Sequence, residues 1–126
     1  MKIESTGRAV ALQLAWGRAA VGLGASFASR PALRGLGFGE TDAAGIALAR
    51  MLGARDLALA TATLAARDDR AALRTATLAA AALDAGDAIA FLYALRDPRT
   101  RRAGLSGVLT AGAAAGAGYW AARRLR

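Results

Sequence analysis

The chain is built from four long apolar blocks separated by short polar segments rich in arginine. The blocks cover residues 9–29, 46–66, 76–95 and 103–122. Each is close to the ~20 residues with which an α-helix crosses a hydrocarbon core of about 30 Å. The connections, of about sixteen, nine and seven residues, imply that neighbouring helices run antiparallel. The pattern predicts an all-α fold in which residues 1–126 form one domain of four antiparallel transmembrane helices.

Residues between the blocks indicate where the helices begin and end. Pro31 is expected to block continuation of the first helix. Thr41 or Asp42 stands where the N-cap of the second long helix should lie. The Gly-rich segment 35–39 has neither a preceding strand nor a following Lys-Ser/Thr pair, so a phosphate-binding loop is not indicated. A flexible turn is expected there, or alternatively a short amphipathic segment on the membrane interface over residues 33–38.

Aromatic residues support these boundaries. Most of them fall near the last turn of a predicted span, where interfacial rings tend to lie in membrane proteins. They are Phe27, Phe91, Tyr93, Tyr119 and Trp120. Trp16 is the exception, because it lies well inside the first block.

Six ionisable residues interrupt the first three blocks, and the fourth block has none. They are Arg18, Arg50, Arg55, Asp56, Asp84 and Asp87. Each costs about 2.5–3.5 kcal/mol at the centre of an isolated span, so the second block, with three of them, should not insert alone. Either the membrane interpretation is wrong or these charges meet one another.

The positions of the six charged residues along their helices favour contact between them. With a rise of about 1.5 Å per residue, antiparallel packing places five of them within about 5 Å of one level, and Arg50 about a turn and a half away. Asp84 and Asp87 share one helix face, and three Arg balance three Asp. We predict an intramembrane Arg–Asp network of all six residues. It can be structural, fixing the register of the helices, or it can belong to a substrate or proton path.

The composition suits close helix packing in lipid. Apolar residues make up 56% of the chain but aromatics only 6%, so the apolar mass is mostly Ala, Leu and Gly. Gly112 and Gly116 match the small-xxx-small contact pattern, which predicts tight packing of the fourth helix inside the bundle or, alternatively, homodimerisation. The chain has no Cys and no His. We therefore expect no metal site, no cofactor and no catalytic residues.

The net charge of +8 raises the possibility of nucleic-acid binding. The basic residues, however, fall mostly in clusters between the apolar blocks, as membrane-flanking charges do. We therefore expect a lipid bilayer as the partner and no nucleic acid. Eight basic residues on the side of the termini against six on the other side favour both termini in the cytoplasm. Arginine in place of lysine and the lack of Asn are typical of a GC-rich bacterial genome, which suggests the bacterial inner membrane.

Two other interpretations of the blocks stay open. The Ala-rich helices could form a soluble four-helix bundle with Arg50 and Arg55 facing outward, although a fourth block of about twenty uncharged residues is hard to solvate. Residues 1–29 could instead be a cleaved signal peptide with small residues at the cleavage site, although Arg18 interrupts its apolar region.

The chain also resembles the small, uncharacterised four-span membrane proteins of GC-rich bacteria that are grouped as domains of unknown function. The resemblance is carried by Arg18 with Gly22 and Gly24, by the segment 49–56, and by the Asp84-x-x-Asp87 pair. It covers nearly the whole chain through short motifs. It implies a polytopic helical membrane protein and transfers no activity.

These observations favour a small polytopic membrane protein with a structural or interaction role, stabilised by the Arg–Asp network. The alternative is a transporter or channel for a small solute or ion, as a homo-oligomer, because one four-helix bundle is too thin to enclose a pathway. An enzyme is not expected, because no catalytic constellation is visible.

Overall fold

The computed structural model describes residues 2–126, with side chains from residue 5 onward, and all regular secondary structure in this range is helical. The helices are α1 (Lys2–Phe27), α2 (Ser29–Leu36), α3 (Ala43–Ala65), α4 (Arg70–Ala94) and α5 (Arg101–Arg124). Each of the four long helices contains most of one predicted apolar block and begins in the polar segment before it. The predicted all-α class is confirmed.

The first long helix ends before Pro31, as expected, but the segment after it is a second, short helix that contains Pro31. α1 ends at Phe27, and α2 starts two residues later with Pro31 in its first turn. Proline is tolerated there because the first N–H groups of a helix have no intrahelical acceptor. Gly37 then ends α2 in the left-handed conformation, with φ 99°. The sequence allowed either a flexible turn or a short amphipathic segment over residues 33–38. Most of this segment belongs to α2.

Two of the long helices, α3 and α4, start at an aspartate that serves as N-cap. The Asp42 carboxylate accepts a hydrogen bond from the Gly45 amide at 2.8 Å, as predicted for the start of α3. The Asp69 carboxylate accepts one from the Ala72 amide at 3.0 Å at the start of α4. Both bonds satisfy a backbone donor that the helix itself leaves unpaired.

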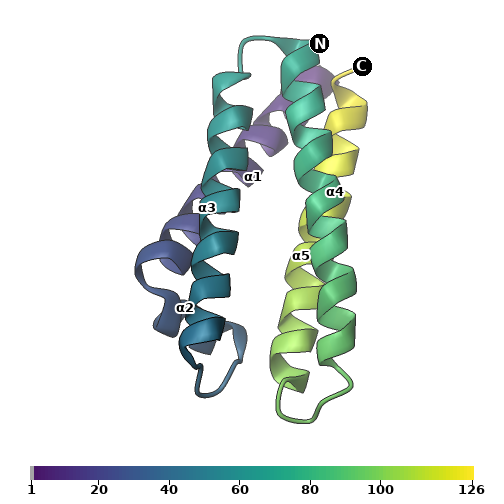
Figure 1. Ribbon diagram of the computed structural model, residues 1–126. Coiled ribbons are helices and arrows are strands. Elements are labelled where there is room, and N and C mark those ends of the chain that lie inside the picture. The colour runs from purple at the N-terminus through teal and green to yellow at the C-terminus, as the bar shows by residue number, and fades with distance from the viewer. Residues whose placement is uncertain (1) are drawn as a thin grey trace.

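The long helices form a ring of four antiparallel neighbours made of two close pairs (Figure 1). α1 packs along α3, and α4 packs along α5 more extensively still. α1 also contacts α5, whereas α3 and α4 touch little. The two termini and the α3–α4 connection lie at one end of the bundle, and α2 and the α4–α5 connection lie at the other (Figure 1). We call these the terminal end and the α2 end.

Glycines allow the close approach inside each pair. A Cβ atom on Gly53 of α3 would lie 2.7 Å from the carbonyl oxygen of Gly22 on α1. In the second pair, the ring of Phe91 on α4 lies against Gly107 on α5, where no side chain would fit. Gly118 lies over Ala81 in the same pair. The predicted close packing of helices through small residues is therefore present, and it occurs at Gly22 with Gly53 and at Gly107 and Gly118.

Gly112 and Gly116 do not take part in it. Both are exposed on α5, and a Cβ atom on either would meet nothing within 4 Å in the described part of the chain. The expectation that this pair packs α5 inside the bundle is wrong. The face of α5 that turns inward carries Gly107 and Gly118, and the helical rotation between them directs the other two glycines outward.

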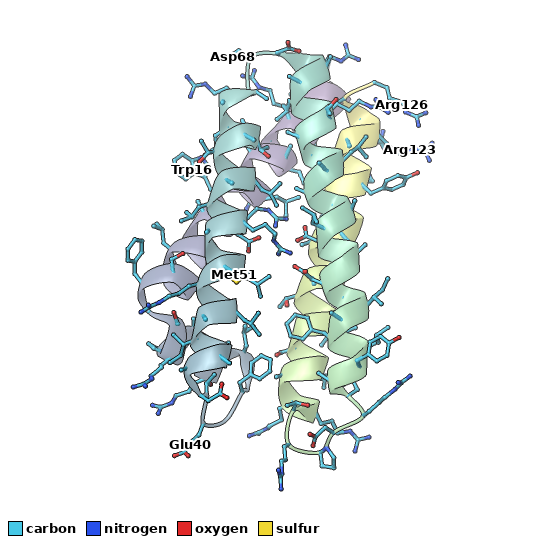
Figure 2. The ribbon with its side chains drawn as sticks, viewed as in Figure 1. Trp16, Glu40, Met51, Asp68, Arg123 and Arg126 are labelled. Atoms are coloured by element: carbon cyan, nitrogen blue, oxygen red, sulfur yellow. The ribbon has the colours of Figure 1, made fainter. Side chains whose placement is uncertain are left out.

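The interior of the bundle is small and partly polar, and its exterior carries many large apolar side chains. Among the side chains described from residue 5 onward, nine of the eleven buried apolar residues are alanines, and the other two are Leu73 and Leu125. Asp56, Asp84, Thr63 and Thr77 are buried as well. In the same range, fifteen large apolar side chains are exposed, among them Trp16, Val21, Leu23, Phe27, Leu48, Met51, Leu52, Leu83, Ile89, Leu92, Leu105, Leu109 and Trp120. Figure 2 shows Trp16 pointing away from the bundle.

By length and composition, one helix of the described chain is apolar enough to cross a membrane, and it is α4. α3 carries Arg50, Arg55 and Asp56, α1 carries Arg18, and α5 is rich in glycine. These residues lower the hydropathy of the other three long helices. A single such helix is weak evidence for a membrane protein, since a core helix of a soluble protein passes the same test.

Candidate functional site

Five ionisable side chains from α1, α3 and α4 meet in the middle of the bundle, between the two helix pairs. They are Arg18, Arg55, Asp56, Asp84 and Asp87. We call this set the Arg–Asp network. It lies where α3 and α4 otherwise touch little, so ion pairs replace apolar contacts between these two helices.

Arg18 of α1 is the link between the pairs. Its Nη1 donates to Asp56 Oδ1 on α3 at 3.2 Å, and its Nη2 donates to Asp84 Oδ2 on α4. All three side chains are at least 87% buried. One guanidinium thus joins three helices, which its planar fork of donors allows and a lysine ammonium would do less well.

Arg55 of α3 forms the second link. Its Nη1 and Nη2 donate to the two carboxylate oxygens of Asp87 on α4, at 2.9 Å and 2.6 Å. The same guanidinium donates to Asp56 Oδ1 through Nη2 at 3.1 Å and through Nε at 3.3 Å. Bidentate pairing of this kind fixes the relative position of the two helices as well as stabilising them.

The five residues form one chain of ion pairs, which runs Asp84, Arg18, Asp56, Arg55, Asp87. Asp56 is shared by both arginines, and each of the other two carboxylates has one arginine. With three carboxylates and two guanidinium groups, the network carries a formal charge of −1.

Arg50 does not belong to this network. It is exposed on α3, and no carboxylate among the side chains described from residue 5 onward lies within ion-pair distance of it. The predicted six-residue neutral cluster is therefore corrected to five residues. The reason is rotation rather than depth, because the six residues from Arg50 to Asp56 turn the helix through about 600°, which leaves the two side chains about 120° apart.

The network is buried at one end and open at the other. The Arg18 end is enclosed by the helices, whereas the side chains of Arg55 and Asp87 are 28% and 30% exposed at the α3–α4 boundary. A cavity of about 10 Å³ reaches Arg18 and Asp84 and is bordered by Thr63 and Thr77. A volume of this size holds about one water molecule.

Thr63 and Thr77 were not singled out from the sequence as neighbours of the charges. Their hydroxyls donate to the carbonyl oxygens of Leu59 at 2.8 Å and Leu73 at 2.7 Å. A signal for them exists: each lies seven residues from a network carboxylate, Asp56 in α3 and Asp84 in α4. Residues seven apart occupy nearly the same helix face, so these threonines follow the carboxylates into the interior.

The ends of the bundle carry cations stacked on aromatic rings. The guanidinium of Arg124 lies 5.2 Å from the ring centre of Trp120, and that of Arg123 lies 5.9 Å from Tyr119. At the α2 end, the guanidinium of Arg96 lies 4.7 Å from the ring centre of Tyr93.

Comparison with known protein families, with curated proteins and with solved structures finds no match for this chain.

Proposed function

We propose that this chain is a small polytopic membrane protein whose four long helices span the bilayer, and whose role is structural or interactive rather than catalytic. The observation that carries the proposal is the inverted distribution of side chains. Asp56, Asp84 and the side chain of Arg18 are buried among alanines, while many Trp, Leu, Ile, Met and Phe side chains are exposed. Water would penalise such a surface, because monomeric soluble proteins rarely expose apolar patches above a few hundred Å². Lipid would solvate it.

The dimensions of the bundle support this environment. The uncharged run of α5, residues 103–122, is about 30 Å long at 1.5 Å per residue, which matches the hydrocarbon core of a bilayer. In α4 the stretch between Arg74 and Arg96 has a similar length and is interrupted only by Asp84 and Asp87. The stacked Arg–aromatic pairs near both ends lie where interfacial anchors are common.

The layering of charge supports it further. The terminal end has eight basic and three acidic residues, the α2 end has six and three, and the middle layer has three and three. The Arg–Asp network carries a formal charge of −1. Arg50, which lies in the same layer but outside the network, brings the net charge of the layer to zero. Arg50 is close enough to the α2 end for its long side chain to extend toward the interface. The excess of basic residues at the terminal end favours the cytoplasm for both termini.

We assign the Arg–Asp network a structural role. Arg18 and Arg55 together connect α1, α3 and α4 at the place where apolar contact is sparse. The cavity beside Arg18 and Asp84 has room for about one water molecule, which is too small for a solute to pass the Arg–Asp network at this point. A transporter would therefore need several copies of the chain, and it stays the second candidate.

Replacing Asp84 with Asn distinguishes the two roles. Asn keeps the shape but not the charge, so Arg18 loses one of its two carboxylates, and we expect a loss of about 1.5–3 kcal/mol in stability. The variant should accumulate less in membranes and unfold at a lower temperature in detergent. Normal accumulation and stability, combined with lost proton flux in proteoliposomes containing a pH-sensitive dye, would instead support transport.

A further inference from the structure

The two helix pairs are joined differently at the two ends of the bundle. At the terminal end α1 packs on α5, and a Cβ atom on Gly7 would lie 3.1 Å from the Ala121 carbonyl oxygen. The hydrophobic core cluster of the described chain lies at the same end and consists of Ala11, Leu73, Ala121 and Leu125. Toward the α2 end α1 packs on α3, where Gly22 meets Gly53, and the two pairs lie farther apart (Figure 1). Direct packing between the pairs is therefore strongest at the terminal end.

At the α2 end, a three-residue segment reaches from the α1–α3 pair to the α4–α5 pair. We call Leu36, Gly37 and Phe38 the strap; they are the last residue of α2 and the two that follow. The Ser106 hydroxyl on α5 donates to the Leu36 carbonyl oxygen. Gly37 lies against the backbone of α5, where a Cβ atom would be 3.1 Å from an amide nitrogen. The centre of the Phe38 ring lies 6.4 Å from that of Phe91 on α4.

The strap makes few contacts, and they can break without disturbing a helix. One hydrogen bond joins it to α5, and one ring contact joins it to α4. Gly37 turns the chain between these contacts at φ 99°, a conformation that residues with a Cβ atom rarely adopt. Because α3 and α4 touch little, few other contacts hold the pairs together at this end. Regions with few packed contacts open at a lower free-energy cost than a buried core, so the α2 end should open before the terminal end.

We infer that the strap holds the two helix pairs together at the α2 end, and that its release lets the pairs swing apart about the terminal end. Each pair moves as a unit, because its helices are packed together along glycines. The partly exposed pair of Arg55 and Asp87 lies on the α3–α4 boundary that this motion widens. The strap thus controls how far the Arg–Asp network is open toward the α2 end. The inference rests on the packing of the bundle and does not depend on the proposed membrane location.

Distances between spin labels on the two pairs test this motion. The natural chain has no cysteine, so labels attach only to introduced thiols. Ala47→Cys on α3 with Arg101→Cys on α5 reports on the α2 end. Ala62→Cys with Arg123→Cys reports on the same two helices near the terminal end, and all four positions are exposed. Pulsed electron paramagnetic resonance on the purified full chain in detergent gives a distance distribution for each labelled pair.

The strap is released by Phe38→Ala with Ser106→Ala, which removes its ring contact and its hydrogen bond. We expect the distance between positions 47 and 101 to lengthen by several ångströms and its distribution to broaden. The distance between positions 62 and 123 should stay unchanged. Phe27→Ala with Thr110→Ala is the matched control, because it removes a ring and a hydroxyl from exposed positions outside the strap, and it should change neither distance.

An unchanged distance between positions 47 and 101 in the released variant would overturn the inference. Equal lengthening of both distances would overturn it as well, because the bundle would then loosen as a whole instead of opening at one end. Circular dichroism checks that the released variant keeps its helices. Should the double variant lose them, Ser106→Ala alone leaves the ring contact in place and gives the same test with a smaller expected shift.

Discussion

Replacing Arg18 with Leu should destabilise the protein by about 3–5 kcal/mol, the cost of leaving buried charges without their partner. The substitution removes the guanidinium between Asp56 and Asp84, and both carboxylates stay in a poorly solvated interior. Asp56 keeps Arg55, but Asp84 has no other arginine among the described side chains. The free energy of unfolding, measured by denaturant titration in mixed micelles, checks this expectation.

Arg50→Leu is the matched control, because it removes the same side chain from an exposed position outside the network. We expect a change within about 0.5 kcal/mol in micelles. A double variant that combines Arg18→Leu with Asp84→Asn removes the carboxylate left without a partner and should recover much of the lost stability. If Arg18→Leu were as stable as Arg50→Leu, the network would not hold the helix pairs together.

Replacing Gly53 with Ala should separate α1 from α3 and cost about 1–3 kcal/mol, the usual range for overpacking a close contact. The new Cβ atom would lie 2.7 Å from the Gly22 carbonyl oxygen and 2.8 Å from the Ser26 amide nitrogen. Both are backbone atoms of α1, so the contact cannot be relieved by turning a side chain. Because Arg55 and Asp56 follow within one turn of α3, the displacement should also disturb the network.

Gly24→Ala provides the control on the same helix pair. A Cβ atom on Gly24 meets nothing within 4 Å in the described structure, so the substitution should be neutral or stabilise the helix by about 0.5–1 kcal/mol. Thermal unfolding in detergent, followed by circular dichroism, compares the two variants. Equal midpoint temperatures would contradict the close crossing at Gly22 and Gly53.

The long helices and the depth of the charges could be predicted because both follow from simple lengths. Apolar blocks bounded by arginine clusters mark the helices, and a fixed rise per residue sets the level of each charge in an antiparallel bundle. That reasoning brought Arg18, Arg55, Asp56, Asp84 and Asp87 to one level, and the structure brings these five into contact.

Depth alone could not exclude Arg50, because it says nothing about which way a side chain faces. The buried residues of α3 are Ala49, Gly53, Asp56, Ala60 and Thr63, spaced alternately by four and three residues. In α1 the series of Gly7, Ala11, Ala15 and Gly22 has a gap that Arg18 fills. This spacing could have placed Asp56 and Arg18 inward and Arg50 outside, but small residues are so frequent in the chain that several such series can be drawn.

The same abundance explains the error at Gly112 and Gly116. Pairs of small residues four apart indicate a face that allows close approach, but the partner helix decides which face is used. The glycines of α5 that contact α4 are Gly107, which packs against the ring of Phe91, and Gly118, which packs against Ala81. These contacts join residues far apart in sequence, so local pattern does not reveal them.

The central claim is that all four long helices span a bilayer, and labelling of single cysteines tests it most directly. The natural chain has no cysteine, so each introduced thiol is the only one present. Glu40→Cys and Arg99→Cys report on the α2 end, while Asp68→Cys and Arg126→Cys report on the terminal end. All four positions are exposed, and Figure 2 shows Glu40 at the opposite end from Asp68 and Arg126. Intact cells are treated with a membrane-impermeant maleimide before and after permeabilisation.

Four spans with cytoplasmic termini predict that positions 40 and 99 react in intact cells, and that positions 68 and 126 react only after permeabilisation. The reverse pattern would keep the four spans and invert the orientation. Reaction of positions 40 and 68 from one side, with 99 and 126 on the other, would leave α4 as the single span and contradict the account. So would four thiols that react only after permeabilisation in a protein recovered from the soluble fraction.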